Sequence, residues 1–149
     1  MSRWSHVGHL ARRFLGSLSR RRPSAQDSAW VTSQLLLEEA VLWQQMPVQD
    51  RRHSIVVARR FVDLAPDAVR AEIAGALLHD VGKSVSGLGT IGRVVATVIG
   101  PHGQRFRSYY DHEALGVEML RVADSEPETL ALIGGGGRFM NELRVADDV

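Results

Sequence analysis

A histidine and an aspartate stand side by side at the end of an apolar run, in the stretch ALLHDVGKS at residues 76–84. Polar groups carried into a hydrophobic interior have to be hydrogen-bonded, paired or bound to a metal. His79 and Asp80 therefore constrain the fold more than any other pair in the chain. Another part of the chain must lie opposite them and supply their partners.

The spacing of apolar residues is helical through most of the chain, and Pro47 and Pro66 interrupt it. Ser24 and Asp27 have the spacing of a capping box at the start of the first helix. The pattern predicts helices over residues 24–46, 48–64, 67–80, 108–122, 127–133 and 138–147. The segment TIGRVVATVIG at 90–100 fits a strand or a buried helix, and helix is preferred because no partner strand is predicted.

The third of these helices is expected to bury one face. Its apolar residues recur at i, i+4, i+7 and i+8, as Val69, Ile73, Ala76 and Leu77. The sum is an all-α fold with short connections.

A length of 149 residues suits one domain, and residues 24–149 are assigned to it. The chain has no cysteine, which excludes disulfides, zinc-thiolate sites and thiol nucleophiles, so any metal must be held by His, Asp or Glu.

A net charge of +1 gives no reason to expect specific nucleic-acid recognition. No apolar run reaches the roughly 18 residues that span a bilayer, and no secretory signal is visible, so a cytoplasmic location is predicted.

Residues 1–23 form a basic extension in which apolar residues alternate with arginines at near-helical spacing. Such a segment can lie as an amphipathic helix on an anionic membrane surface. The alternative is a partly ordered tail with solvated charges, and that interpretation is preferred.

Two glycine-rich stretches resemble phosphate-binding loops only superficially. GLGTIG at 87–92 matches G-x-G-x-x-G, but it follows a predicted helix rather than a strand and no βαβ unit surrounds it. GGGG at 134–137 has no following lysine and hydroxyl residue. The first is interpreted as a chance match and the second as a flexible connector.

Three of the six histidines lie on predicted helices beside apolar residues, namely His53, His79 and His112. Any one of them alone would be interpreted as a hydrogen-bonded core histidine. Together with Asp80 they favour a shared metal ion, which would satisfy several at once. Lys83 follows at a distance that suits contact with a phosphate held by the same ion.

His53, then HDVGK at 79–83, then an aspartate late in a helical domain resembles the HD-domain superfamily of metal-dependent phosphohydrolases. The resemblance covers about residues 27–149. It implies a single helical domain with a metal site between helices. The ligands that it implies are His53, His79, Asp80 and a C-terminal aspartate.

The sequence LRVAD occurs twice, at 120–124 and 143–147, and each copy offers an Ala-Asp pair of the kind that carries the last ligand in the family. His112 and Asp124 are separated by about 18 Å of helical rise, so they cannot serve one site together. The segment YYDHEALGVEML resembles the family segment with a further histidine, which His112 matches. If His112 faces the site, Asp147 is the better ligand, and Asp124 remains the alternative.

The chain departs from the two-metal members of the family, because no histidine follows His112. One divalent ion (Mn, Fe, Mg, Ni or Zn) is therefore expected, with a second weak or absent. The implied function is hydrolysis of a phosphorylated small molecule such as a nucleotide, with Asp80, Lys83 and His112 as catalytic candidates. The alternative is a catalytically weak or inactive HD domain that binds metal or nucleotide as a regulatory module.

Overall fold

The computed structural model describes residues 21–83 and 112–148, and every regular element in these two ranges is a helix. The helices are α2 (Ala25–Gln34), α3 (Leu37–Gln45), α4 (Val48–Leu64), α5 (Arg70–Leu78), α8 (His112–Val122), α9 (Pro127–Ile133) and α10 (Met140–Asp147). The prediction of an all-α fold is thus confirmed. The predicted helices in residues 1–20 and 90–100 lie outside the described residues.

Two predicted helices agree with the structure at both ends. Pro47 precedes α4 and Pro127 is the first residue of α9, where a missing backbone N–H costs nothing because that group has no intrahelical partner. Ser24 caps α2, since its hydroxyl accepts a hydrogen bond from the Asp27 N–H at 3.1 Å. The prolines and the cap are local signals, and they predict boundaries well.

The predicted helix over residues 24–46 is wrong in one respect, because it is broken into α2 and α3. Leu35 and Leu36 adopt extended backbone angles between the two helices. Glu39 restarts the helix by accepting a hydrogen bond from the Leu36 N–H at 2.8 Å. The Glu39 side chain is completely buried and also accepts a hydrogen bond from the Ser125 hydroxyl at 2.8 Å. A contact across 86 residues thus stabilises the break.

The helix predicted over residues 67–80 is shorter in the structure, where α5 begins at Arg70 and ends at Leu78. Glu72 accepts a hydrogen bond from the Val69 N–H, so the first helical turn is capped from within. Val69 was predicted to be buried, but it is 48% exposed because it lies outside that turn. One further start differs, since α10 begins at Met140 rather than 138. The predicted start at 108 lies outside the described residues, which resume at His112.

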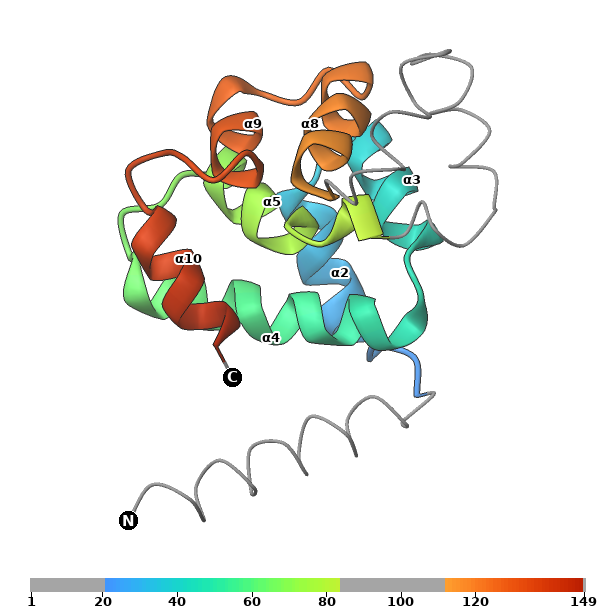
Figure 1. Cartoon of the computed structure of the whole chain (residues 1–149). Helices are drawn as coiled ribbons and strands as arrows, with labels where there is room; N and C mark the ends of the chain where they lie inside the picture. Colours follow the sequence, from blue (N-terminus) through green and yellow to red (C-terminus); the bar gives the residue numbers. More distant parts are fainter. Residues whose placement is uncertain (1–20, 84–111, 149) are drawn as a thin grey trace, which may run out of the picture.

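Helix α5 is the centre of the domain, with α4, α9, α2 and α3 packed around it (Figure 1). Residues 74–78 are all buried, which requires neighbours on every side of the helix. Gly75 permits the closest approach, since a Cβ there would lie 3.0 Å from the Leu132 side chain of α9. The end of α5 is therefore delivered into the interior of the domain.

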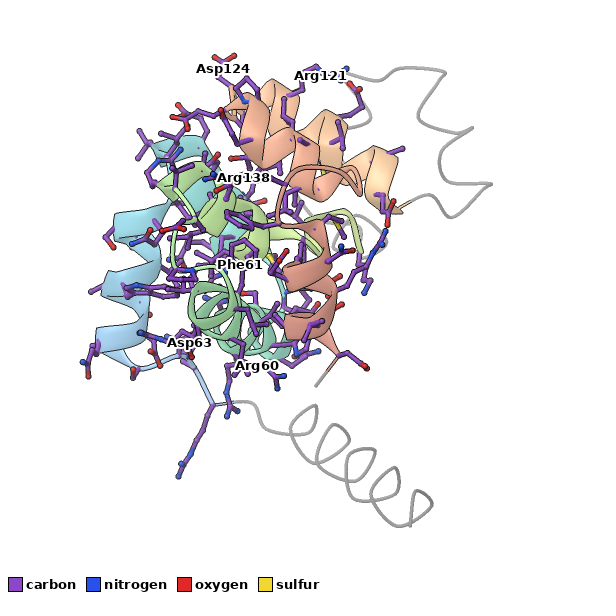
Figure 2. The ribbon with its side chains drawn as sticks, turned by 90° about the vertical axis from the view of Figure 1, so that its left-hand side faces the viewer. Arg60, Phe61, Asp63, Arg121, Asp124 and Arg138 are labelled. Atoms are coloured by element: carbon purple, nitrogen blue, oxygen red, sulfur yellow. The ribbon has the colours of Figure 1, made fainter. Side chains whose placement is uncertain are left out.

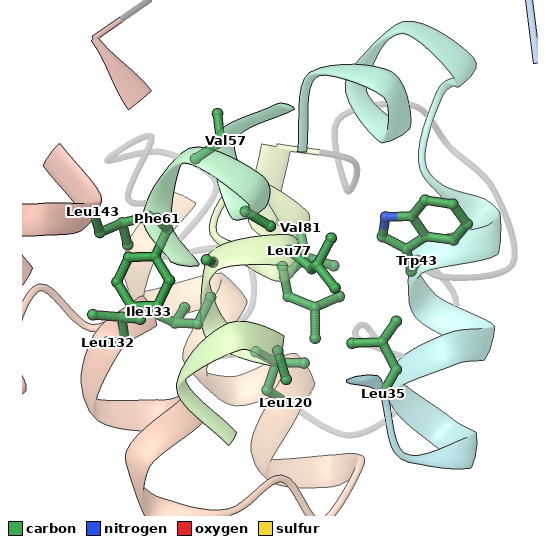
Figure 3. Close-up of a cluster of buried hydrophobic side chains, with 14 of the residues drawn as sticks. Leu35, Trp43, Val57, Phe61, Leu77, Val81, Leu120, Leu132, Ile133 and Leu143 are labelled. Carbon is green, nitrogen blue, oxygen red and sulfur yellow. The ribbon is translucent and has the colours of Figure 1, made fainter. Parts of the chain in front are cut away.

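The core continues from α5 toward α4, α9 and α10. Figure 3 shows Phe61 of α4 beside Leu132, Ile133 and Leu143. Helix α10 lies across α4 (Figure 1), and this packing brings the end of α10 against α4. None of the described helices is both long and apolar enough to cross a membrane.

Candidate metal centre

Four side chains from three parts of the chain converge where α5 ends. His53 lies on α4, His79 is the C-cap of α5, Asp80 follows it, and Asp147 is the last residue of α10. One ligand atom from each lies within 4.8 Å of all the others. The family resemblance implies these four residues as metal ligands, with Asp124 as the alternative to Asp147, and they come from elements far apart in the chain.

Asp147 contacts both histidines of the cluster. Its Oδ1 lies 3.0 Å from His53 Nε2 and 3.2 Å from His79 Nε2, so the carboxylate accepts from both imidazoles. His79 Nε2 also lies 3.4 Å from Asp80 Oδ2. The side chain of His79 is only 9% exposed, whereas that of Asp147 is 42% exposed. The cluster is thus closed on the α5 side and open on the α10 side.

The backbone orients His79 for ligation. Its Nδ1 lies 2.7 Å from the carbonyl oxygen of Ala76, one turn earlier in α5, and donates to it. A hydrogen bond of this kind is usual for metal-ligating histidines, because it fixes the tautomer and leaves Nε2 for the ion. The helix therefore presents Nε2 to the cluster.

The charges of the metal-free cluster are strongly coupled. Burial lowers the pKa of His79, but hydrogen bonds to Asp147 and Asp80 outweigh it and raise this pKa to about 10. Burial raises the pKa of Asp80, and the neighbouring His79 and Lys83 bring it down to about 2. Hydrogen bonds from His53 and His79 hold the pKa of Asp147 well below its usual range. In the metal-free protein the positive charge of protonated His79 thus lies among the side chains that could bind a metal cation.

The donor set and its spacing fit a divalent metal ion. Two ligands that are each about 2.1 Å from an ion lie about 3.0 Å apart at a right angle and about 3.4 Å apart at the tetrahedral angle. The three contacts among His53, His79, Asp80 and Asp147 measure 3.0, 3.2 and 3.4 Å. All four ligand atoms lie within 4.8 Å of one another, so two imidazoles and two carboxylates can be brought around one ion.

Lys83 lies beside this cluster. Its Nζ is 2.8 Å from Asp80 Oδ1, and 58% of its side chain is exposed. Residues 81–83 form a single 3₁₀ turn, closed by a 3.0 Å hydrogen bond from the Lys83 N–H to the Asp80 carbonyl. On α8, a Cβ at Gly116 would lie 3.5 Å from the Gly82 nitrogen, so this helix packs closely against the turn. The turn places the ammonium group at the exposed edge of the cluster.

Of the two LRVAD aspartates, the structure places Asp147 in the cluster. Asp124 follows α8 in a left-handed conformation with φ of 54°. Figure 2 shows Asp124 with Arg121 at the far edge of the molecule, well away from Phe61 and α4. Asp124 is therefore not brought to His53.

Some residues named from the sequence cannot be placed. His112 is the first residue of α8, but its side chain lies outside the described part of the chain. The GLGTIG stretch at 87–92 also falls outside the described residues.

The GGGG stretch is an ordered turn rather than a flexible connector. The Gly136 N–H bonds to the Ala131 carbonyl at 2.8 Å and the Gly135 N–H to the Leu132 carbonyl at 3.3 Å. This is the Schellman pattern, with Gly135 at φ of 83° as the left-handed residue. The turn ends α9 and sets the direction in which the chain enters α10 and reaches Asp147.

Asp50 is a site neighbour that sequence reasoning missed. Burial raises the pKa of its carboxyl, the negative charge of Asp80 raises it further, and Lys83 and His53 oppose the shift. Asp50 therefore lies within electrostatic range of three residues of the site. The sequence spacing could have indicated this, because Asp50 lies three residues before His53 and therefore on the same face of α4.

Comparisons of this chain with family models, with curated proteins and with solved structures found no match. The observed class is thus an all-α domain with a histidine and aspartate cluster that can hold a metal ion.

Proposed function

We propose that this protein is a metal-dependent phosphohydrolase of the HD-domain type, acting on a nucleotide or another phosphorylated small molecule. The observation that carries the proposal is the convergence of His53, His79, Asp80 and Asp147, with the Lys83 ammonium at its edge. Metal ligands alone would suit many functions. A cation next to them favours an anionic substrate.

The proposed cofactor is one divalent ion held by these four residues. Two imidazole nitrogens favour Fe, Ni or Zn over Mg, which prefers oxygen ligands. The chemistry that such an ion supplies when bound is a lowered pKa of water and polarisation of the phosphoryl group.

The chain's own residues have distinct roles in the proposed reaction. Hydrolysis forms a bond from water oxygen to phosphorus and breaks the ester bond, and the leaving oxygen takes up a proton. Asp80 orients the attacking water and accepts its proton. Lys83 offsets negative charge on the phosphoryl oxygens, which requires its Nζ to turn from Asp80 toward the substrate. His112 is the candidate donor of the proton to the leaving oxygen.

A screen of the full-length protein against phosphomonoesters and nucleotides, with Mn²⁺, Fe²⁺, Mg²⁺, Ni²⁺ or Zn²⁺ added, tests the proposal. Asp80→Ala is expected to lose both metal content and turnover while circular dichroism stays helical. Asp63→Ala is the matched control, because Asp63 is an exposed aspartate on α4 that does not belong to the cluster. Full turnover by Asp80→Ala would rule the proposal out.

The second candidate is a non-catalytic module that binds metal or nucleotide. It is favoured by one feature of the sequence, the absence of any histidine after His112. The same screen separates the two functions. Nucleotide-dependent stabilisation of the metal-loaded protein without turnover would establish the module.

A further inference from the structure

A cavity lies away from the metal cluster, at the opposite end of α5. Its volume is about 490 Å³. Its apolar wall consists of Val69, Pro127, Ala131, Leu132 and Phe139. Since α5 has nine residues, the cavity and His79 are separated by about 13 Å of helix. The proposed phosphohydrolase function does not use this cavity.

The charged residues around the cavity are mainly acidic. Arg138 is the one cation in its lining among the described residues, and Glu72 already holds it through contacts of 2.8 and 3.1 Å. Glu128 also lines the cavity, and Asp67 lies near enough to act on the Arg138 charge. Three carboxylates thus surround one guanidinium. An occupant with both apolar and cationic groups would suit this surface.

The chain itself contains such a segment. Residues 1–20 have four arginines and no acidic residue, with apolar side chains at near-helical spacing, namely Trp4, Val7, Leu10, Phe14, Leu15 and Leu18. By contrast, residues 21–83 and 112–148 have 16 acidic and 11 basic side chains. The described part of the domain and the N-terminal segment therefore carry opposite net charges.

The connection is long enough for the segment to reach the cavity. Residues 21–24 precede α2 outside any helix and span about 13 Å when extended. Twenty residues in a helix add about 30 Å. The radius of gyration of a domain of about 100 residues is only about 13 Å.

We propose that residues 1–20 dock within the same chain into the cavity formed by the start of α5, by α9 and by residues 137–139. The apolar face of the segment covers Val69 and Phe139, and an arginine of the segment pairs with Glu128. This gives the 48% exposed Val69 side chain an apolar partner.

The test uses the full-length protein, which has no native cysteine. A nitroxide attached to Ser17→Cys broadens the amide NMR signals of residues near it. We expect Val69, Ala131 and Gly137 to lose at least half of their intensity, whereas Leu37 and Val41 on α3 keep theirs. Uniform intensity across these residues would overturn the proposal.

A charge-reversal pair sharpens the test. Glu128→Lys is expected to abolish the selective broadening at the cavity, and Glu38→Lys, an equal charge change on the exposed face of α3, is expected to leave it in place. Equal broadening in both variants contradicts docking at Glu128. As a further control, spin-labelled protein without isotope labels is mixed with isotope-labelled protein of the native, cysteine-free sequence. This mixture must give no selective broadening, because broadening there would mean that the segment docks on a second copy.

Discussion

The two LRVAD copies, at 120–124 across the end of α8 and at 143–147 on α10, have the same sequence and similar local burial but different surroundings. In both copies the leucine and the alanine are buried and the arginine and the valine are exposed. The helical register of the five residues is thus shared. The difference lies in the final aspartate.

Helix α8 ends before its aspartate, whereas α10 includes it. Asp124 turns into the left-handed region, where its N–H bonds to the Arg121 carbonyl at 3.1 Å. Asp147 remains helical and meets His53 and His79. The comparison shows that a repeated motif acquires a role from the elements opposite it, because only α10 crosses α4 beside the end of α5.

The largest expected effect separates the two aspartates directly. Asp147→Ala should lower the affinity for Mn²⁺ or Zn²⁺ at least about 100-fold, since loss of an outer hydrogen-bond partner alone costs about 10- to 100-fold. Asp124→Ala should leave the affinity unchanged. Isothermal titration calorimetry of both variants measures this, and equal losses would show that Asp147 is no ligand.

The pH dependence of metal binding should also distinguish the two copies. Because the pKa of His79 is about 10 in the metal-free protein, binding has to displace a proton from that imidazole. Affinity should therefore rise roughly tenfold per pH unit between about pH 7 and 9. Asp124→Ala should keep this slope and Asp147→Ala should reduce it, because Asp147 contributes to the raised pKa. A flat profile in the unsubstituted protein would contradict a protonated His79.

The stability of the metal-free protein should respond in a defined pH window. The raised pKa of His79 stabilises the fold fully below about 6.5, and this contribution is lost as the pH rises toward about 10. The lowered pKa values of Asp80 and Asp147 stabilise it above about 3.8, and that contribution is lost as the pH falls toward about 2. Urea unfolding after chelation should show maximal stability between about pH 3.8 and 6.5. Asp147→Ala should weaken the loss of stability both above and below this range, while Asp124→Ala should leave both losses unchanged.

The smallest expected effect concerns the backbone. Asp124→Gly should stabilise the protein by about 0.5–1 kcal/mol, because glycine adopts the left-handed conformation without the cost that a Cβ brings. Asp147→Gly should destabilise it, since the residue is helical and bonded to two histidines. Thermal unfolding measures both changes. Destabilisation by Asp124→Gly would show that its side chain has a role in the turn.

Much of the fold was predictable because its signals are local. Pro47 and Pro66 predicted both ends of α4, the helical pattern predicted the range of α9, and the family resemblance carried by His53 and the HDVGK stretch implied three members of the cluster. The break between α2 and α3 was missed because it depends on the burial of Glu39 against Ser125, and no local pattern reports that contact. Asp50 was missed because its carboxyl becomes part of the site only when Asp80 and Lys83 fold against α4.

The sequence by itself determined the helical class, the absence of thiol chemistry and the presence of a polar pair at the end of a buried helix, since composition and periodicity are properties of the chain alone. Only the tertiary structure decided which of the two aspartates lies beside His79 and Asp80. Both candidates end the same five residues, and the physical difference is the Gly134–Gly137 turn, which directs α10 across α4 and brings Asp147 to His53 and His79.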